Sequence, residues 1–380
     1  MIDWAGLLAD EPLPAAVIDL DAVDRNTRTL LQHLGASGKT ARLATKSLRV
    51  PALFRHLAGL DPRVRGLMAY SAREAGWLVE QGFHDVLVAY PVARTADATL
   101  VGHAEIVQVI DDEAQLAALA GTGARVCIDV DVSLRTLGQH LGVRRSPVRD
   151  AARALVVARK AREAGLHVVA VMAYEAQVAG LSDGGAWFER PVKRWLKARS
   201  VPLAAARRKE VVDALRADGF AIALVNGGGS GSVATTAADP VCTEVTIGSG
   251  CLCPHLFDGY LGLPLEPAAF FALSVVRSSD AGFVTAFGGG IVASGSTGTD
   301  RSPVVHWPTN LAPLPLEGFG EVQTPFRVTA GDAPRIGSPV VCRPAKSGEW
   351  LERFNEVLLV RNGAVVERAP TYRGLGVSFG

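Results

Sequence analysis

One lysine near the start of the sequence stands where an α/β fold places reactive side chains. Residues 41–46 read A-R-L-A-T-K, a short apolar run that predicts a strand with Lys46 at its carboxyl end. In a barrel of parallel strands and helices, the carboxyl ends of the strands face the active site. A lysine amine that is shielded from water there can bond covalently to a carbonyl carbon. A solvated surface lysine is the alternative, and position alone does not exclude it.

A glycine-rich loop follows a much later predicted strand. Residues 226–232 read N-G-G-G-S-G-S, directly after the apolar run 221–225. Consecutive glycines let backbone N–H groups converge on one anion, and the serine hydroxyls add donors. Phosphate sites in such barrels commonly follow the late strands. Residues 248–250, G-S-G, follow the next strand and are placed to close the same site. A flexible turn is the other interpretation of the loop.

Strand-like and helix-like segments alternate over the first two thirds of the chain and would position both features. The predicted strands are 15–20, 41–46, 66–71, 85–90, 105–110, 124–132, 167–176, 221–229 and 241–247. The predicted helices between them are 21–37, 51–60, 72–82, 112–123, 148–166 and 203–218. This alternation implies a parallel sheet, and roughly eight strands favour its closure into a (β/α)8 barrel.

The composition and the residue pattern of the sequence change near residue 262. Proline and glycine become frequent, and short β-branched runs alternate with turn signals such as Arg361-Asn362-Gly363. We therefore expect an α/β barrel over residues 14–260 and an all-β domain over residues 261–380. We expect residues 1–13 to pack on this C-terminal β domain.

An early reactive lysine and a late anion loop on a (β/α)8 barrel are together the outline of a pyridoxal 5′-phosphate site. The chain also resembles the D-threonine aldolase and D-serine dehydratase family, which has the alanine-racemase-like fold of type III pyridoxal phosphate enzymes. The segments that carry this resemblance are 14–26, 44–47, 173–177, 226–232 and 243–250. A nearer likeness is to a bacterial branch called amino acid deaminase/aldolase, through 128–135, 142–147 and 345–349. The likeness covers nearly the whole chain.

The resemblance implies roles at the matching positions. Lys46 would form the internal aldimine with pyridoxal phosphate. Arg135 would face the pyridine ring or its hydroxyl, with Arg144 as the competing candidate, and an arginine there moderates the electron sink. Tyr174 and Gln177 would line the pocket, although Tyr174 also fits a core tyrosine whose hydroxyl finds a partner. The phosphate loop and its surroundings would be Asn226, Gly228, Gly229, Ser230, Gly231, Gly248 and Ser249.

The chain departs from the family at the metal site. The resemblance implies a divalent metal bound through an H-x-D or H-x-C pair, but the matching stretch 342–346 reads C-R-P-A-K. Pro344 and Lys346 stand at the ligand positions, and neither ligates a divalent ion in the usual way. We therefore expect no metal there and infer that the Lys346 ammonium replaces part of its charge. A surface lysine is the alternative.

Two histidines are further candidates for the base that the reaction needs. They are His306 and His255, and a structural role is the alternative for each. His255 also ends the sequence C-L-C-P-H, which contains Cys251 and Cys253 and could in principle hold a metal. Buried core cysteines are the competing interpretation, and we prefer it.

The resemblance implies a lyase that acts on a small D- or β-hydroxy amino acid and cleaves or forms a Cα–Cβ bond. A D-serine dehydratase-like deaminase is one alternative. An amino acid racemase is another, with Tyr372 or Tyr260 as the second base. A pyridoxal phosphate carrier that is not an enzyme is the third, although such carriers normally end after the barrel.

Composition excludes several other classes of protein. Lys and Arg number 39 against 38 Asp and Glu, a net charge of +1, so no basic excess is available for binding nucleic acid. No apolar run approaches the ~20 residues that span a membrane. The first residues carry acids where a signal peptide would carry Lys or Arg, so we expect a cytoplasmic protein. The resemblance implies a homodimer in which the β domain of one subunit caps the barrel of the other.

Overall fold

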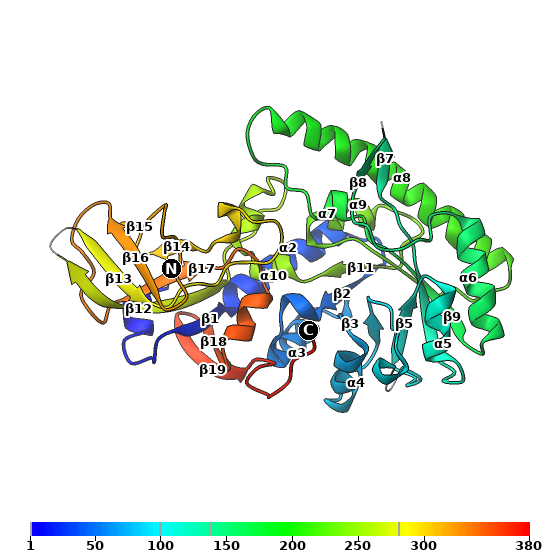
Figure 1. Cartoon of the computed structure of the whole chain (residues 1–380), viewed down its shortest axis with the longest axis horizontal. Helices are drawn as coiled ribbons and strands as arrows, with labels where there is room; N and C mark the ends of the chain where they lie inside the picture. The colour runs from blue at the N-terminus through cyan, green and yellow to red at the C-terminus, as the bar shows by residue number, and fades with distance from the viewer. Residues whose placement is uncertain (1, 99–100, 137, 280–281) are drawn as a thin grey trace.

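Two β structures lie side by side and organise the chain (Figure 1). A computed structural model describes residues 2–98, 101–136, 138–279 and 282–380. One structure is a closed barrel of eight strands, and the other is a nine-stranded sheet. The expected (β/α)8 barrel with a C-terminal β domain is therefore confirmed.

The barrel strands are all parallel and follow the order β10-β11-β2-β3-β4-β5-β6-β9. Most of their residues are buried, because the barrel interior covers one face and helices cover the other. Their bounds are β2 Thr40–Ala44, β3 Val64–Ala69, β4 Val86–Val88, β5 Ile106–Ile110, β6 Arg125–Asp129, β9 His167–Ala173, β10 Leu224–Gly227 and β11 Glu244–Ile247.

Helices connect these strands on the outside of the barrel. They are α2 Leu20–Leu34, α3 Pro51–Leu60, α4 Ala72–Glu80, α5 Leu116–Leu119, α6 Ala151–Glu163, α7 Ala176–Ala179, α8 Glu189–Ala217, α9 Val233–Ala237 and α10 Ser249–Leu252. The helix expected at 203–218 is wrong at its start, because α8 begins at Glu189 and carries Pro202 inside it. Residues 189–199 of α8 bury no side chain and so lack the apolar periodicity that marks a helix in the sequence.

The nine-stranded sheet contains the C-terminal strands and one strand from the N-terminus. Its order is β15-β16-β13-β12-β1-β18-β19, with β17 paired to β12 and β14 paired to β17. The bounds are β1 Ala15–Asp19, β12 Ala269–Ser279, β13 Phe283–Phe287, β14 Val304–Trp307, β15 Leu311–Pro313, β16 Gln323–Val328, β17 Pro339–Arg343, β18 Glu356–Arg361 and β19 Ala364–Pro370.

The first predicted strand lies in this sheet and not in the barrel. β1 pairs antiparallel with β12 and parallel with β18. Val17 and Ile18 are fully buried on opposite faces of β1. An apolar strand buried on both faces is typical of barrels and of sheet interiors alike, so its sequence does not reveal which sheet it joins.

The N-terminal segment packs on the same sheet through the short helix α1, Trp4–Leu7. The rings of Trp4 and Phe270 lie 4.9 Å apart edge to face, and Leu358 belongs to the same buried cluster. The first residues of the described chain thus pack against the sheet that contains the C-terminal strands.

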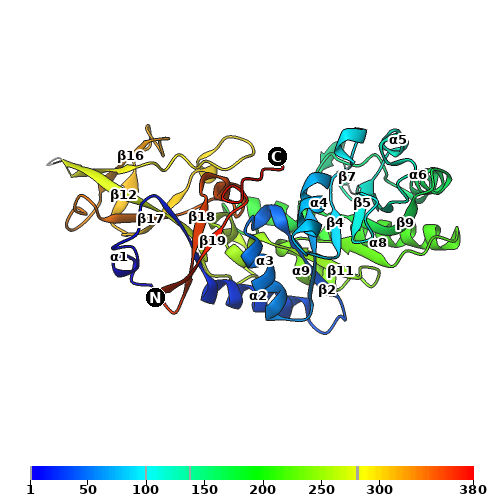
Figure 2. The same cartoon turned by 90° about the horizontal axis from the view of Figure 1, so that it is seen from below.

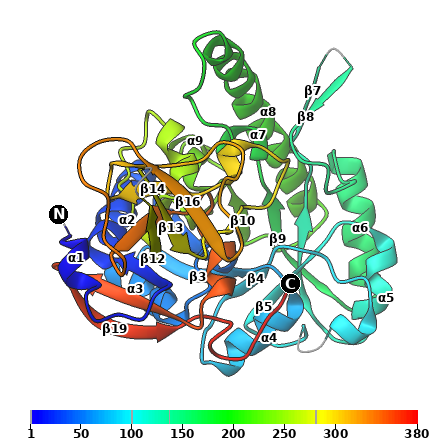
Figure 3. The ribbon, with the colours of Figure 1, turned by 60° about the vertical axis from the view of Figure 1, so that its left-hand side comes forward.

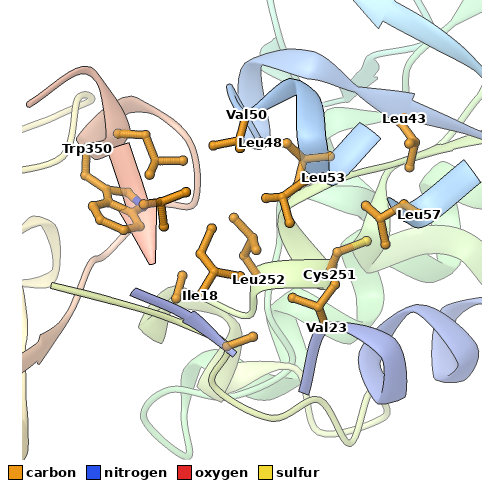
Figure 4. Close-up of a cluster of buried hydrophobic side chains, with 14 of the residues drawn as sticks. Ile18, Val23, Leu43, Leu48, Val50, Leu53, Leu57, Cys251, Leu252 and Trp350 are labelled. Carbon is orange, nitrogen blue, oxygen red and sulfur yellow. The ribbon is translucent and has the colours of Figure 1, made fainter. Parts of the chain in front are cut away.

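A continuous apolar core joins the barrel to the sheet. Figure 2 shows α2 and α3 at the centre of the molecule, between the two β structures. Figure 4 shows Ile18 of β1 and Trp350 of the β domain beside Leu48, Leu53 and Leu252 of the barrel. Because this core is close-packed, the sheet holds a fixed position relative to the carboxyl ends of the barrel strands.

A two-stranded hairpin is inserted between β6 and α6. It consists of β7 Leu134–Thr136 and β8 Gln139–Leu141, and it stands away from the barrel (Figure 3). Within the described ranges, no helix combines the length and the apolar character that crossing a membrane requires.

Candidate active site

A cavity of about 660 Å³ opens at the carboxyl ends of the barrel strands. This volume lies in the range typical of small-molecule sites. One wall comes from the barrel and contains Lys46, Tyr174 and the two glycine stretches. The other comes from the β domain of the same chain and contains residues 294, 300–301 and 345–349. The described cavity therefore draws on both β structures.

Lys46 lies on the barrel wall directly after β2, in the short 3₁₀ turn Thr45–Ser47. The Thr45 hydroxyl donates to the Met68 carbonyl at 2.9 Å, and the Ser47 and Ser249 hydroxyl oxygens are 3.1 Å apart. Both neighbours of Lys46 are buried, whereas the lysine itself is exposed. The turn is thus fixed and leaves the amine accessible from the cavity.

The glycine loop after β10 lines the cavity beside Lys46, through residues 228–231. Gly228 has φ +74°, a conformation that favours glycine. A Cβ on Gly231 would lie 2.2 Å from the Ala179 carbonyl oxygen. The Ser230 hydroxyl accepts from the Gly248 and Gly250 amides at 3.1 and 3.0 Å. The structure therefore brings together the two glycine stretches, as the sequence predicted.

A buried ionic network supports this loop from behind. Glu175 accepts from the Gly228 amide at 3.1 Å and from Arg208 at 2.5 Å. Arg208 also donates to Asp239 at 2.5 Å, and the Thr236 hydroxyl donates to Glu175 at 2.5 Å. The side chains of Glu175, Arg208 and Asp239 are each no more than 4% exposed. The sequence alone did not reveal this network, because its three charged members are more than 30 residues apart and share no local motif.

Asn226 also lines the cavity, at the end of β10. Its amide donates to Glu244 at 2.6 Å and to the Thr246 hydroxyl at 2.9 Å. Glu244 in turn pairs with the buried Arg42 at 2.6 Å. Asn226 is therefore held by side-chain contacts that connect β10 with β11 and, through Arg42, with β2.

Tyr174 lines the cavity together with an arginine that the sequence analysis did not select. The guanidinium of Arg145 lies 5.5 Å from the centre of the Tyr174 ring and 5.7 Å from that of Tyr90. Burial raises the pKa of Tyr174, although Arg145 opposes this, so its phenol is protonated at neutral pH. All three side chains are part of the cavity wall.

The two predicted arginines and Gln177 do not line the cavity. Arg135 is exposed on the hairpin, 3.5 Å from Asp131, and Arg144 is exposed at the base of the hairpin. Gln177 is buried and donates to the Val132 carbonyl at 2.8 Å. The arginine that does line the cavity is Arg145, the residue after the candidate Arg144.

Lys346 lines the cavity from the β-domain side, as its predicted role requires. Its amine donates to the Ser294 hydroxyl at 2.9 Å, and the Ser294 amide donates to Glu349 at 2.9 Å. No carboxylate lies within salt-bridge distance of Lys346 in the part of the chain that the structure describes.

Neither histidine candidate is part of the cavity lining, although the chain neighbours of His255, Pro254 and Leu256, are. The ring of His306 packs 4.7 Å from Phe270 and 6.0 Å from Trp4, and burial lowers the pKa of His306. His255 Nε2 lies 2.8 Å from the Ser302 carbonyl oxygen. Both therefore have the structural surroundings that were the alternative interpretation.

The cysteines and the candidate metal stretch also take structural positions. All five cysteines are free and buried, so the interpretation as core cysteines is confirmed. The carbonyl of Pro344 accepts from the His255 amide at 3.1 Å. Among the described residues, no group of three or more His, Cys, Asp or Glu side chains could hold a metal ion.

The two tyrosines considered as racemase bases are placed differently. Tyr372 is fully buried outside the cavity and donates to Glu74 at 2.8 Å. Tyr260 lines the cavity and donates to the Ala179 carbonyl at 2.9 Å. Burial raises the pKa of both phenols, so neither is a ready base near neutral pH.

Three features together define a class of protein. They are a lysine after the first strand of a (β/α)8 barrel, two glycine stretches that line the same cavity, and a β domain that supplies the other wall of that cavity. Residues 18–252, more than half of the chain, match the family model described as the alanine racemase N-terminal domain, and the chain belongs to this family. The family includes the D-threonine aldolases and is pyridoxal 5′-phosphate-dependent.

Curated relatives are more distant and match only in part. The chain is 27% identical over 251 residues to a 3-hydroxy-D-aspartate aldolase of Paracoccus denitrificans (strain Pd 1222), covering 62% of this chain and 59% of that protein. It is 26% identical over 251 residues to a D-threonine aldolase of Arthrobacter sp., covering 64% and 61%. The matches thus span about three fifths of these relatives.

A solved structure shows that the fold is shared over nearly the whole length. The D-threonine aldolase from Filomicrobium marinum superposes with a TM-score of 0.80 at 22% identity, covering 97% of this chain and 96% of that chain.

Proposed function

We propose that this chain is a pyridoxal phosphate-dependent lyase that cleaves or forms the Cα–Cβ bond of a small D- or β-hydroxy amino acid. The observation that carries the proposal is that Lys46 and the glycine stretches 228–231 and 248–249 line one cavity. The names of the curated relatives, two aldolases for D-amino acids, support this class of reaction.

The barrel wall fits the cofactor. A Cβ on Gly229 would lie 3.1 Å from Ala179 Cβ, and one on Gly231 would clash with the Ala179 carbonyl, so glycines let the loop backbone form a close-fitting cradle. In our proposal this cradle would hold the phosphate, Lys46 would be the residue that binds the aldehyde group, and Arg145 and Tyr174 would face the ring. Bound pyridoxal phosphate withdraws electrons from the bonds at the substrate's α-carbon.

Lys346 is the proposed group for the substrate's β-oxygen. Its amine has one described hydrogen-bond partner, the Ser294 hydroxyl, which leaves N–H donors for a ligand in the cavity. A nearby ammonium favours a negatively charged oxygen and so eases loss of the hydroxyl proton. In this proposal Lys346 supplies charge that a metal would otherwise provide. His306, which packs among aromatic rings, has no part in the reaction.

The positions of the tyrosines favour the lyase over the racemase. Tyr372 donates to Glu74 outside the cavity, and Tyr260 donates its hydroxyl proton to a backbone carbonyl. The contribution of residues 345–349 to the cavity favours an enzyme over a carrier, because a carrier needs no wall facing the substrate. A dehydratase uses the same residues and is distinguished by its products. The expected homodimer and cytoplasmic location stay predictions.

The test combines cofactor spectroscopy with product analysis in the presence of a metal chelator. We expect the protein loaded with pyridoxal phosphate to show a visible absorption band that Lys46→Ala abolishes, while Lys209→Ala, an exposed lysine paired with Asp213, retains it. D-Threonine is then expected to yield glycine and acetaldehyde. Lys346→Met should lower this turnover by about 100-fold and leave the band in place.

Three results would count against the proposal. Failure to take up the cofactor would remove its basis. Release of ammonia and a keto acid would assign a dehydratase. Exchange of the α-proton without cleavage of any bond to the β-carbon would assign a racemase.

A further inference from the structure

We propose that Gly348 is a positioning residue that sets the place of Lys46 and its distance from Lys346. The proposal rests on the function proposed above, in which these two lysines face the same substrate. It concerns the turn 345–349, which reads A-K-S-G-E and forms part of the β-domain wall of the cavity.

The backbone of Gly348 packs directly on the backbone of Lys46. A Cβ on Gly348 would lie 1.8 Å from the Lys46 carbonyl oxygen and 2.8 Å from the Ser47 Cα. Gly348 has φ −106° and ψ −42°, values open to any residue, so the need for glycine is steric and not conformational. An added methyl group would have to separate the turn from the lysine by roughly 1 Å.

The lysine turn is also confined from the opposite side. A Cβ on Gly248 of the second glycine stretch would lie 3.0 Å from Ser47 Cβ and 3.1 Å from Ala44 Cβ. The turn Thr45–Ser47 therefore lies between two glycines, Gly248 from the barrel and Gly348 from the β domain. Because the Gly248 backbone also packs closely on this turn, a methyl on Gly348 would press Lys46 into surroundings with little spare room.

The segment after Gly348 is anchored, so it cannot simply move away. Trp350 is 2% exposed in the apolar core between the two β structures, and its indole N–H donates to the Ser347 carbonyl at 2.6 Å (Figure 4). Glu352 pairs with Arg49 at 2.5 Å, and Arg49 Nε donates to the Lys46 carbonyl at 3.3 Å. The β domain thus holds the lysine turn through packing and through a charged pair.

Gly348 also sets the place of the second lysine. Lys346 lies two residues earlier in the same turn, and Ser294 holds its amine. Displacement of the turn would therefore change the spacing of both amines from the substrate. A misplacement of about 1 Å at a reacting centre can cost about 100-fold in rate.

The test compares Gly348→Ala with Gly262→Ala in the protein loaded with pyridoxal phosphate. Gly262 lies in an exposed turn, and a Cβ there would meet nothing within 4 Å, so its replacement should leave every property unchanged. For Gly348→Ala we expect kcat to fall by about 10- to 100-fold, with a smaller change in KM. We also expect the pH titration of the cofactor's visible band to shift before any substrate is added.

The pH titration of the visible band without substrate distinguishes a positioning role from a general loss of stability. A purely structural defect lowers the unfolding temperature but does not shift this titration. Trp350→Phe provides a second route if Gly348→Ala does not fold. It removes the bond to the Ser347 carbonyl without adding an atom, and we expect the same two changes at smaller size. Unchanged band titration and kcat in the variant that folds would overturn the positioning role alone. A wild-type protein that binds no cofactor would overturn the proposed function and the positioning role together.

Discussion

The two walls of the cavity are held in place by different means. The barrel wall is over-determined: Glu175 alone joins the Gly228 amide, Arg208, Ser232 and Thr236. On the β-domain wall, Trp350 anchors the turn in the core, but the Lys346 side chain has a single described partner. The difference indicates that a buried ionic network fixes the part proposed to hold the cofactor, whereas the lysine side chain proposed to face the substrate can change with few consequences for the fold.

The largest expected effect comes from breaking the barrel wall. Arg208→Met would leave Glu175 and Asp239 buried without their partner, and removal of one member of a buried ion pair costs about 3–5 kcal/mol. Chemical denaturation measures this loss in the free energy of unfolding. Lys209→Met, on the exposed side of the same helix, is the control and should change it by less than about 0.5 kcal/mol. If both variants lost the same free energy of unfolding, the buried ionic network would not be what fixes the barrel wall.

An intermediate effect is expected at a seam outside the cavity, where the barrel meets the C-terminal segment and Glu74 accepts from Tyr372. Burial raises the pKa of Glu74 from 4.5 to about 7, although hydrogen bonds from Thr45, Tyr70 and Tyr372 oppose the shift. The folded state therefore retains a proton that the unfolded chain loses near pH 4.5. This contribution to stability is fully present below that pH and is lost as the pH rises to about 7.

Glu74→Gln tests this seam. The wild type should lose roughly 2–4 kcal/mol of unfolding free energy between pH 4.5 and 7 through this group, and the variant should lack that slope. Glu80→Gln, at the exposed end of the same helix, should keep it. Burial raises the pKa of Asp129 to about 7 as well, so all three proteins share a residual slope. Identical pH profiles for wild type and Glu74→Gln would contradict the prediction.

The smallest expected effect distinguishes the arginine at the cavity from the one on the hairpin. Arg145→Met should weaken pyridoxal phosphate binding by about 10- to 100-fold, because a charged hydrogen-bond donor is worth about 1.5–3 kcal/mol. Arg135→Met should leave binding unchanged, since Arg135 is exposed beside Asp131. Titration of the apoprotein with the cofactor gives both affinities. Weaker cofactor binding in Arg135→Met, with unchanged binding in Arg145→Met, would instead support Arg135 as the arginine that faces the pyridine ring.

Features carried by local patterns could be predicted from the sequence. Apolar strands alternating with helices indicated the barrel, and glycine runs after late strands indicated two loops that do face one cavity. Features that depend on long-range placement could not. The pattern of β1 fits either β structure, and the arginine at the cavity is Arg145, next in the chain to the candidate Arg144. Gln177 was expected at the end of a strand, but it lies in the short helix α7 and its side chain donates to the Val132 carbonyl instead of lining the site.

The position of β1 has a consequence for how the chain is made. Val17 pairs with Phe270 on one side and Leu358 on the other, about 250 and 340 residues later in the sequence. At roughly 5–20 residues per second on the ribosome, the second neighbour emerges roughly 20–70 s after β1. An apolar strand with two unpaired edges must stay soluble through that interval, whereas each barrel strand has at least one neighbour close by in the sequence, as β2 has in β3. The nine-stranded sheet, which provides one wall of the cavity, is therefore expected to be the last part of the molecule to form.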